Sequence, residues 1–469
     1  MARAKGEPAR NALAVAAGGV VQLARAALLG PLLTRSLGLQ LYGTLTSAIG
    51  LVATFRPLVG AGITPVLTGA IVREPDAEAP ILRATMRDCS WLAGALWMLI
   101  TVGAWLWMGR GMAVAVACLG VLLVADVVTL RGLPLRARLR GDRLLGAQLI
   151  GEVLAVAAVA IAAFRHRGVG ALALCFGLAG LLQGLLVAHA GRSVAIADRA
   201  PAPPRWEMLR QALPSMGISA AVAICVQFDV VLLALLRGPA AAAPYAAAER
   251  VLLLALLVPQ AIASSLLPSF AKEGKPSDPR LIRAVLLLAG LGFPLAAFAP
   301  FYSDVLPMLL GRSFSASAPL TVILAWRMAG MFLATPIDTF LIGTGRQRDV
   351  LVCHGCASVV FILLALPLTN AFGAPGTAAA AVLAEAIKVT LLLRFSGAAT
   401  VRPIVRGLAQ LGGCILVAQA LGRWAGGHAV GLAISVPIYL ALMETRKLRS
   451  LSPINALIQF ARNGCEETP

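Results

Sequence analysis

The feature that most constrains this chain is a succession of long apolar stretches separated by short polar segments. A helix needs about 20 mainly apolar residues to cross the hydrocarbon core of a bilayer, and stretches of that length recur along the whole sequence. Only 13% of the residues are charged, whereas soluble domains contain about 25%. Because lipid offers no hydrogen-bond partner to exposed peptide groups, stretches of this length are expected to cross as helices. We therefore expect an all-α integral membrane protein.

Fourteen spans are predicted at this length. The last two are the weakest of them, so the expected count is 12–14 transmembrane helices. The predicted spans lie near residues 11–34, 41–70, 90–108, 112–132, 144–164, 169–190, 212–236, 245–270, 281–310, 319–343, 349–370, 373–395, 403–423 and 428–443.

The basic residues predict the orientation of these spans. The net charge of +19 does not indicate nucleic-acid binding, because the Lys and Arg residues fall between apolar stretches and not on one polar domain. With the N-terminus inside, 28 of the 40 Lys and Arg residues lie in inner segments, 7 lie in outer segments and 5 lie within spans. This excess follows the positive-inside rule, so we expect both termini on the cytoplasmic side.

An internal repeat with an offset of 203 to 205 residues runs through the chain. Tyr42 precedes Pro65 by 23 residues, and Tyr245 precedes Pro268 by the same number. A duplicated unit of six spans keeps both halves the same way round, as in transporters built from parallel repeats, which predicts two pseudo-symmetric six-helix lobes. The predicted organisation is an N-terminal lobe at 1–195, a cytoplasmic linker at 196–211, a C-terminal lobe at 212–398, two further spans within 399–445 and a cytoplasmic tail at 446–469.

Cations inside the predicted spans are the main functional signal, because a charge at the bilayer centre costs a few kcal/mol or more unless it meets water or a partner. Arg25, Arg56 and Arg327 lie deep in their spans, and none has an acid near it in the sequence. Unpaired guanidinium groups at this depth indicate a water-filled cavity, and their forked donors suit phosphate. The predicted substrate-binding residues of this cationic cavity are Arg25, Arg56, Arg327, Lys388, Arg250 and Gln22.

Structural ion pairs or snorkelling side chains are the alternative interpretation of these cations. It applies most directly to Arg250, which follows Glu249, and to Lys388, which lies three residues after Glu385 and can pair with it. The other acids predicted within or near the ends of spans are Asp126, Glu152, Asp229 and Asp338.

Polar residues share one helical face in two of the predicted spans. Gln22 lies on the same face as Arg25 in the first span, and Asp229 shares a face with Ser215 and Ser219 in the seventh. A carboxylate beside hydroxyl groups in a partly dry cavity can bind H⁺ or Na⁺. Asp229 is therefore a predicted ion-coupling residue, with Glu385 as a second candidate.

Proline and glycine are expected to bend or break three of the spans, at four positions. The positions are Arg56-Pro57, Gly60-Ala61-Gly62, Val258-Pro259 and Phe293-Pro294. Transporters tolerate such breaks where the backbone lines a cavity, although simple kinks without a role are an equal alternative.

The spacing of Cys353 and Cys356 is that of a metal-binding pair. The sequence contains no second pair of ligands with a suitable spacing. We therefore expect no metal site and no cofactor.

Several of these segments resemble bacterial polysaccharide flippases. Leu33–Gly38, followed by Leu41-Tyr42-Gly43 and Gly60-Ala61-Gly62, is similar to the start of these Wzx-type proteins. They are members of the multidrug/oligosaccharidyl-lipid/polysaccharide (MOP) exporter superfamily. The stretches Pro244–Arg250 and Phe372–Gly376 extend the resemblance, which covers roughly residues 10–395.

The resemblance implies a two-lobed MOP/MATE-like transporter in the bacterial inner membrane. Such proteins move a polyprenyl-diphosphate-linked saccharide from the inner to the outer leaflet by alternating access, for O-antigen, lipopolysaccharide or exopolysaccharide synthesis. A cationic cavity takes the diphosphate and sugar, the lipid tail stays in the bilayer, and the cavity cations match Arg25 and Arg56 here. We expect a monomer that meets the lipid bilayer and its lipid-linked substrate, with H⁺ or Na⁺ as a further candidate partner.

Three other functions compete with this one. A lipid II flippase of the same superfamily is consistent with arginines in the first, second and eighth spans. A multidrug antiporter of the same fold would favour acids over cations in its spans, because its usual cargoes are cations. A polysaccharide polymerase or ligase would need a sizeable outer loop with catalytic groups, and the predicted outer loops are short. We therefore expect a transporter and not an enzyme.

The predicted topology can be tested at Cys465 in the C-terminal tail. Because the tail is expected inside, Cys465 should stay unlabelled when intact cells meet a membrane-impermeant thiol reagent, and should label after permeabilisation. Arg110→Cys is the matched control, since it places a thiol on a predicted outer segment. Labelling of Cys465 at the rate of the control, in intact cells, would contradict the cytoplasmic assignment.

Overall fold

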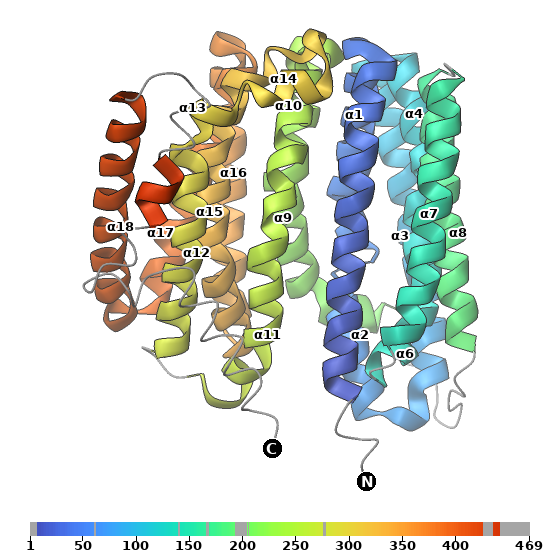
Figure 1. Ribbon diagram of the computed structural model, residues 1–469. Helices are drawn as coiled ribbons and strands as arrows, with labels where there is room; N and C mark the ends of the chain where they lie inside the picture. The colour runs from blue at the N-terminus through green and yellow to red at the C-terminus, as the bar shows by residue number, and fades with distance from the viewer. Residues whose placement is uncertain are drawn as a thin grey trace. The chain divides into compact units, whose positions relative to one another are not determined.

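Helices form all of the secondary structure that the computed structural model describes (Figure 1). Within the described residues, twelve helical segments are long and apolar enough to cross a membrane. The all-α, multi-span fold expected from the sequence is thus confirmed. The described residues are 7–60, 62–138, 141–165, 168–192, 204, 206–274, 278–424 and 435–440.

The chain divides into two compact units. The first comprises Met1–Ala247 and Thr369–Ala374, and the second comprises Ala248–Leu368 and Pro375–Pro469. The first unit contains α1 (Glu7–Phe55), α2 (Thr64–Arg73), α3 (Glu78–Met108), α4 (Arg110–Leu119), α5 (Val121–Thr129), α6 (Leu133–Ala137), α7 (Gly141–Phe164), α8 (Val169–Arg192), α9 (Glu207–Arg237) and the start of α10 (Pro239–Leu253). The second contains the end of α10, α11 (Leu257–Glu273), α12 (Pro279–Ala297), α13 (Ala299–Tyr302), α14 (Val305–Leu310), α15 (Ser317–Gly343), most of α16 (Gln347–Phe372), α17 (Ala374–Ser396) and α18 (Ala398–Trp424). Single 3₁₀ turns are formed by Arg56–Leu58, Pro75–Ala77, Leu130–Gly132, Leu254–Leu256 and Arg312–Phe314.

α1 contains two spans that meet at Gly38. Gly38 has a φ of 69° and a ψ of 177°, which interrupts the helix in a conformation that residues with a Cβ rarely adopt. A straight helix of 49 residues would be about 73 Å long, more than twice the roughly 30 Å of a hydrocarbon core. α1 begins at the end of the first unit where α2 also lies (Figure 1). The two legs, 7–37 and 39–55, therefore run in opposite directions and correspond to the first two predicted spans.

Proline interrupts the spans close to the predicted positions. Arg56–Leu58 forms a 3₁₀ turn after the second leg of α1. Leu254–Leu256 forms another between α10 and α11, because Pro259 has no N–H and its ring crowds the carbonyl four residues earlier. α12, in contrast, continues through Pro294.

The ninth predicted span is shorter than expected. The stretch 281–310 does not form one helix, since α12 ends at Ala297 and the short helices α13 and α14 follow. Pro300 lacks the N–H that would continue the hydrogen bonds of α12, so the helix cannot extend through it. The predicted span 428–443 lies outside the described residues except for 435–440, which are helical. α18 covers the thirteenth predicted span, 403–423, so the fourteenth is the span that stays a prediction.

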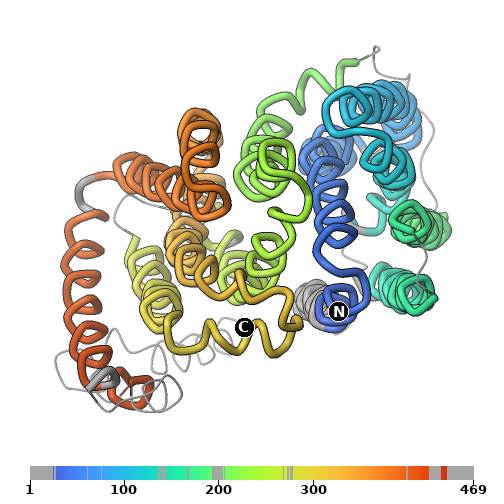
Figure 2. Tube along the Cα trace, turned by 90° about the horizontal axis from the view of Figure 1, so that it is seen from above, coloured from blue at the N-terminus to red at the C-terminus, as the bar shows by residue number. Residues whose placement is uncertain are grey.

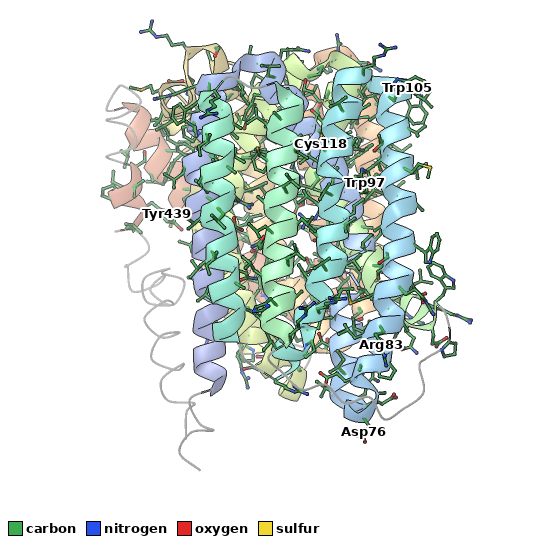
Figure 3. The ribbon with its side chains drawn as sticks, turned by 90° about the vertical axis from the view of Figure 1, so that its right-hand side faces the viewer. Asp76, Arg83, Trp97, Trp105, Cys118 and Tyr439 are labelled. Atoms are coloured by element: carbon green, nitrogen blue, oxygen red, sulfur yellow. The ribbon has the colours of Figure 1, made fainter. Side chains whose placement is uncertain are left out.

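Helices of the first unit lie side by side along their length. Asp76 and Arg83 mark one end of α3, and Trp105 marks the other (Figure 3). Between these ends, Nε1 of Trp97 donates a hydrogen bond of 3.0 Å to the carbonyl of Ala117 on α4, which ties the two neighbouring helices together. Seen from above, α7 and α8 lie next to α1 and are viewed nearly end-on (Figure 2).

Backbone contacts join α1 to α9 and α10 within the first unit. A Cβ atom added at Gly43 would lie 1.8 Å from the carbonyl oxygen of Pro239, far inside van der Waals contact. A Cβ atom at Gly50 would lie 2.8 Å from the carbonyl oxygen of Gln227. No side chain fits between the helices at these points, so glycine sets the distance between them.

We predict that Gly43→Ala destabilises the protein by about 1–3 kcal/mol or more, because the added methyl group overpacks a contact with rigid backbone. The measurement is thermal unfolding of detergent-solubilised protein, followed by the loss of the monodisperse peak. Gly94→Ala on α3 is the matched control, since a Cβ there meets nothing within 4 Å. Equal stability of the two variants would contradict the packing described here.

Candidate functional site

Arg25 links three helices of the first unit. It lies on the first leg of α1, and its Nη1 donates to Oε2 of Glu152 on α7 at 2.8 Å. The other oxygen of Glu152 accepts a long hydrogen bond of 3.5 Å from Nε2 of Gln183 on α8. The Glu152 side chain is buried, whereas the Arg25 side chain is 38% exposed. The ion pair therefore holds the guanidinium in place and leaves part of it accessible.

Arg56 makes a two-pronged ion pair at the helix break. Its Nε and Nη2 donate to the two carboxylate oxygens of Asp126 on α5, at 2.7 and 2.6 Å. Gly60 lies against this carboxylate, and a Cβ atom there would be 3.0 Å from the Cβ of Asp126. The Arg56 side chain is 42% exposed, so this guanidinium is also fixed but accessible.

The turn that follows Arg56 is tied to α9. The hydroxyl of Ser215 donates to the carbonyl oxygen of Gly62 at 2.5 Å. A Cβ atom at Gly62 would lie 2.7 Å from the Cα of Met216, so the turn touches α9 directly. Ser215 thus satisfies a carbonyl that the helix break leaves without a helical partner.

Arg25 and Arg56 lie at similar depths on the two legs of α1. Counted from Gly38, Arg25 is 13 residues down one leg and Arg56 is 18 residues down the other. At 1.5 Å per residue these positions are about 20 and 27 Å from the turn. Two partly exposed guanidinium groups therefore occur within about 7 Å of the same level in the first unit.

Arg327 differs from these two because it is buried. It lies on α15 in the second unit, and its Nη1 donates to Oε1 of Glu249 at 2.6 Å. Its side chain is only 2% exposed. In this conformation the guanidinium is closed off by its partner and its surroundings, so its contacts are those of a structural ion pair.

The remaining predicted cavity residues are less informative. Lys388 forms an ion pair of 2.8 Å with Glu385 on α17, as their spacing in the sequence predicted. Arg250 is half-buried on α10. Gln22 lies on α1, and its side chain is outside the described part of the structure.

Asp229, the predicted ion-coupling residue, is fully buried on α9. One carboxylate oxygen accepts the Tyr245 hydroxyl at 2.8 Å, and the other accepts the Val230 N–H at 2.7 Å. Ser219 and Ser215 lie 10 and 14 residues away along the same helix, which is about 15 and 21 Å. They share a face with Asp229 but cannot bind one ion with it. The predicted role of Asp229 therefore lacks the hydroxyl partners on which it depended.

The expectation that Arg25, Arg56 and Arg327 lack acid partners is wrong. Their partners lie 127, 70 and 78 residues away along the chain, on helices whose packing is not readable from local spacing. The alternative interpretation, an ion pair, holds for all three. The Arg25 and Arg56 side chains are partly exposed beside their partners, whereas that of Arg327 is buried.

The fold defines a class of protein: a multi-pass helical membrane protein built like MOP-superfamily transporters. The lipid II flippase MurJ in an inward closed conformation is similar, with a TM-score of 0.68 and 14% identity over 92% of this chain and 98% of that one. An inward-facing MATE multidrug resistance transporter of the superfamily is also similar, with a TM-score of 0.60 and 14% identity over 81% of this chain and 93% of that one. A MOP superfamily transporter from Pyrococcus furiosus has a TM-score of 0.58 and 13% identity over 87% of this chain and 96% of that one.

The sequence further assigns the chain to a family. The model for the family described as polysaccharide biosynthesis protein matches residues 9–273, more than half of the chain, so the chain belongs to that family. No curated protein matches the sequence. The superfamily expected from the motifs around Tyr42 and Gly60 is thus confirmed.

We predict that Arg327→Ala destabilises the protein by about 3–5 kcal/mol, because it leaves the buried Glu249 carboxylate without its partner. The double variant Arg327→Leu/Glu249→Leu should recover much of that stability, since it removes both charges. Thermal unfolding in detergent measures both. An Arg327→Ala protein as stable as wild type would contradict a structural role for the pair.

Proposed function

We propose that this protein moves a polyprenyl-diphosphate-linked saccharide from the inner to the outer leaflet of the bacterial inner membrane by alternating access. The observation that carries the proposal is the pair of fixed, partly exposed guanidinium groups, Arg25 and Arg56, at similar depth on the two legs of α1. A diphosphate needs cations inside the membrane, and its acyl chain can remain in lipid while the headgroup crosses. Membership of the polysaccharide biosynthesis family supports a saccharide as the cargo.

Anion binding at these arginines would proceed by exchange of partners. Asp126 and Glu152 hold the guanidinium groups in position when the site is empty, which avoids a bare charge in the membrane. The arriving diphosphate replaces or joins a carboxylate, and the planar fork of arginine matches two phosphate oxygens. On release, the carboxylates recover their partners, so neither state leaves the cation unpaired.

The predicted cavity residues fall into two groups according to the exposure of their side chains. Arg25 and Arg56 can meet a ligand in this conformation, whereas Arg327 and Lys388 are buried against Glu249 and Glu385. We propose that the diphosphate is bound from the first unit and that Arg327 is structural. The excess of Lys and Arg in inner segments supports cytoplasmic termini.

A multidrug antiporter is a weaker candidate for this chain. Its usual cationic cargoes would need an available acid, and four of the six acids predicted in the spans, Glu152, Asp126, Glu249 and Glu385, each face a Lys or Arg. A lipid II flippase remains the nearer alternative, because lipid II presents the same diphosphate and the fold is similar to that of MurJ. Direct binding of both lipid-linked substrates to the purified protein distinguishes these two cargoes.

The arginines can be tested by binding of a lipid-linked saccharide to protein in nanodiscs, normalised to folded protein. Each charge-assisted hydrogen bond contributes about 1.5–3 kcal/mol, so Arg25→Ala and Arg56→Ala should weaken binding roughly 10- to 100-fold. Lysine keeps the charge but loses the fork, so Arg56→Lys should fall between wild type and alanine. Arg402→Ala is the control, since it removes an exposed cation at the start of α18.

A variant of Asp126, the acid partner of Arg56, distinguishes substrate binding from a structural role more sharply. Asp126→Asn removes the competing carboxylate and leaves the cation, so it should bind the lipid-linked saccharide at least as tightly as wild type. A purely structural pair predicts the opposite: Arg56→Ala and Asp126→Asn would both lose stability, and neither would change binding per folded molecule. Folded Arg25→Ala and Arg56→Ala proteins with unchanged affinity and transport would refute the proposal.

A further inference from the structure

A histidine and a carboxylate meet inside the second unit, away from the arginines. His354 lies on α16, and its Nε2 is 3.1 Å from Oδ2 of Asp338 on α15. The His354 side chain is 6% exposed, whereas that of Asp338 is 19% exposed. The imidazole is therefore enclosed, and the Asp338 side chain is the more exposed of the two.

Each side chain of this pair keeps one polar atom without a hydrogen-bond partner. Among the described residues, neither Nδ1 of His354 nor Oδ1 of Asp338 has one, and both atoms are buried. A buried polar atom without a partner is unfavourable and calls for an explanation. If Nε2 carries the hydrogen and donates it to Asp338, the lone pair on Nδ1 is free to accept a proton.

Two further ion pairs lie on α17 and at the start of α16. On α17, Lys388 and Glu385 neutralise each other at 2.8 Å, and Glu385 also packs against Gly330 of α15. On α16 itself, Asp349 is paired with Arg346 at 2.6 Å.

Cys353 precedes His354 on α16, and the charges of Asp338, Asp349 and Lys388 act on its thiol. Within this group of charges, Glu385 and Asp349 each face a cation, whereas Asp338 faces the imidazole of His354.

The pair lies within reach of one side of the membrane. α15 ends at Gly343 and α16 begins at Gln347, so their adjoining ends share a side, which is the predicted cytoplasmic one. Asp338 is five residues from that end and His354 is seven, about 8 and 11 Å along the helices. Asp338 is therefore about 3 Å nearer to that side than His354, counted along the helices.

We propose that His354 and Asp338 form a proton-binding site that couples transport to a proton gradient. A proton from water adds to Nδ1 of His354 and gives an imidazolium whose Nε2–H stays bonded to Asp338; release returns that proton to water and restores the neutral ring. The coupling rests on the proposed transport function, whereas proton binding does not. The sequence-based candidates are less suited to this role, because both oxygens of Asp229 accept hydrogen bonds and Glu385 faces Lys388.

Proton binding can be measured directly, because the chain has only four histidines. In protein labelled with ¹⁵N-histidine in nanodiscs, His354→Gln assigns the His354 signal, and His189→Gln assigns an exposed histidine at the end of α8 as the control. We expect the His354 signal to convert reversibly to imidazolium between pH 5 and 9. In Asp338→Asn, the imidazolium fraction at the wild-type midpoint should fall about fivefold or more, because the stabilising negative charge is lost. A His354 signal that stays in one protonation state over this range would overturn the proposal.

Coupling is tested with a fluorescent polyprenyl-diphosphate-linked saccharide in proteoliposomes. Glutamine can still donate a hydrogen bond to Asp338 but cannot take up a proton, so His354→Gln should fold and lose the acceleration that a pH gradient gives wild type and His189→Gln. Retained acceleration in folded His354→Gln would overturn the coupling. If wild type moves no such lipid, the proposed function fails; the titration of His354 then decides the proton site by itself.

Discussion

A guanidinium group inside a membrane protein must meet an opposite charge or water, and this requirement organises the packing described above. In the first unit, Arg25 joins α1 to α7 through Glu152, and Arg56 joins the end of α1 to α5 through Asp126. In the second unit, Arg327 joins α15 to α10 through Glu249. The same contacts that make these charges tolerable in lipid also decide which helices are neighbours.

The three pairs differ in exposure. We base the proposed division between anion-binding arginines and a structural arginine on that difference. Arg327 is enclosed together with its partner, so the pair can only hold helices together. The partner of Arg25 is buried and that of Arg56 is partly buried, whereas the two arginine side chains are 38% and 42% exposed. In each pair the carboxylate fixes the direction of the guanidinium group. The proposed anion site depends on this combination of a fixed direction and an exposed side chain.

Local signals in the sequence predicted the fold and only some of the site. The positions of most spans, the break at Pro57 and the Glu385–Lys388 pair depend on residues within one helix or turn, and the structure agrees with them; the ninth span, which ends early at Ala297, is the exception. The ion pairs of Arg25, Arg56 and Arg327 depend on which helices touch, and spacing in one sequence contains no such information. The six acids were visible in the spans, and a nearly balanced count of embedded acids and cations was the available hint. His354 lies between Cys353 and Cys356 in the sequence, whereas its contact is with Asp338 on another helix, which local spacing does not reveal.

The long sequence separation of the ion pairs has a consequence for biogenesis. Arg56 leaves the ribosome 70 residues before Asp126, and Arg25 leaves it 127 residues before Glu152. During synthesis the first two legs therefore enter the translocation machinery as a cationic hairpin, turned at Gly38, without their carboxylates. Such a hairpin is poorly suited to lipid alone. It should linger at the insertion channel or with a chaperone until α5 and α7 arrive, so the first unit assembles only after about its first 150 residues have been made.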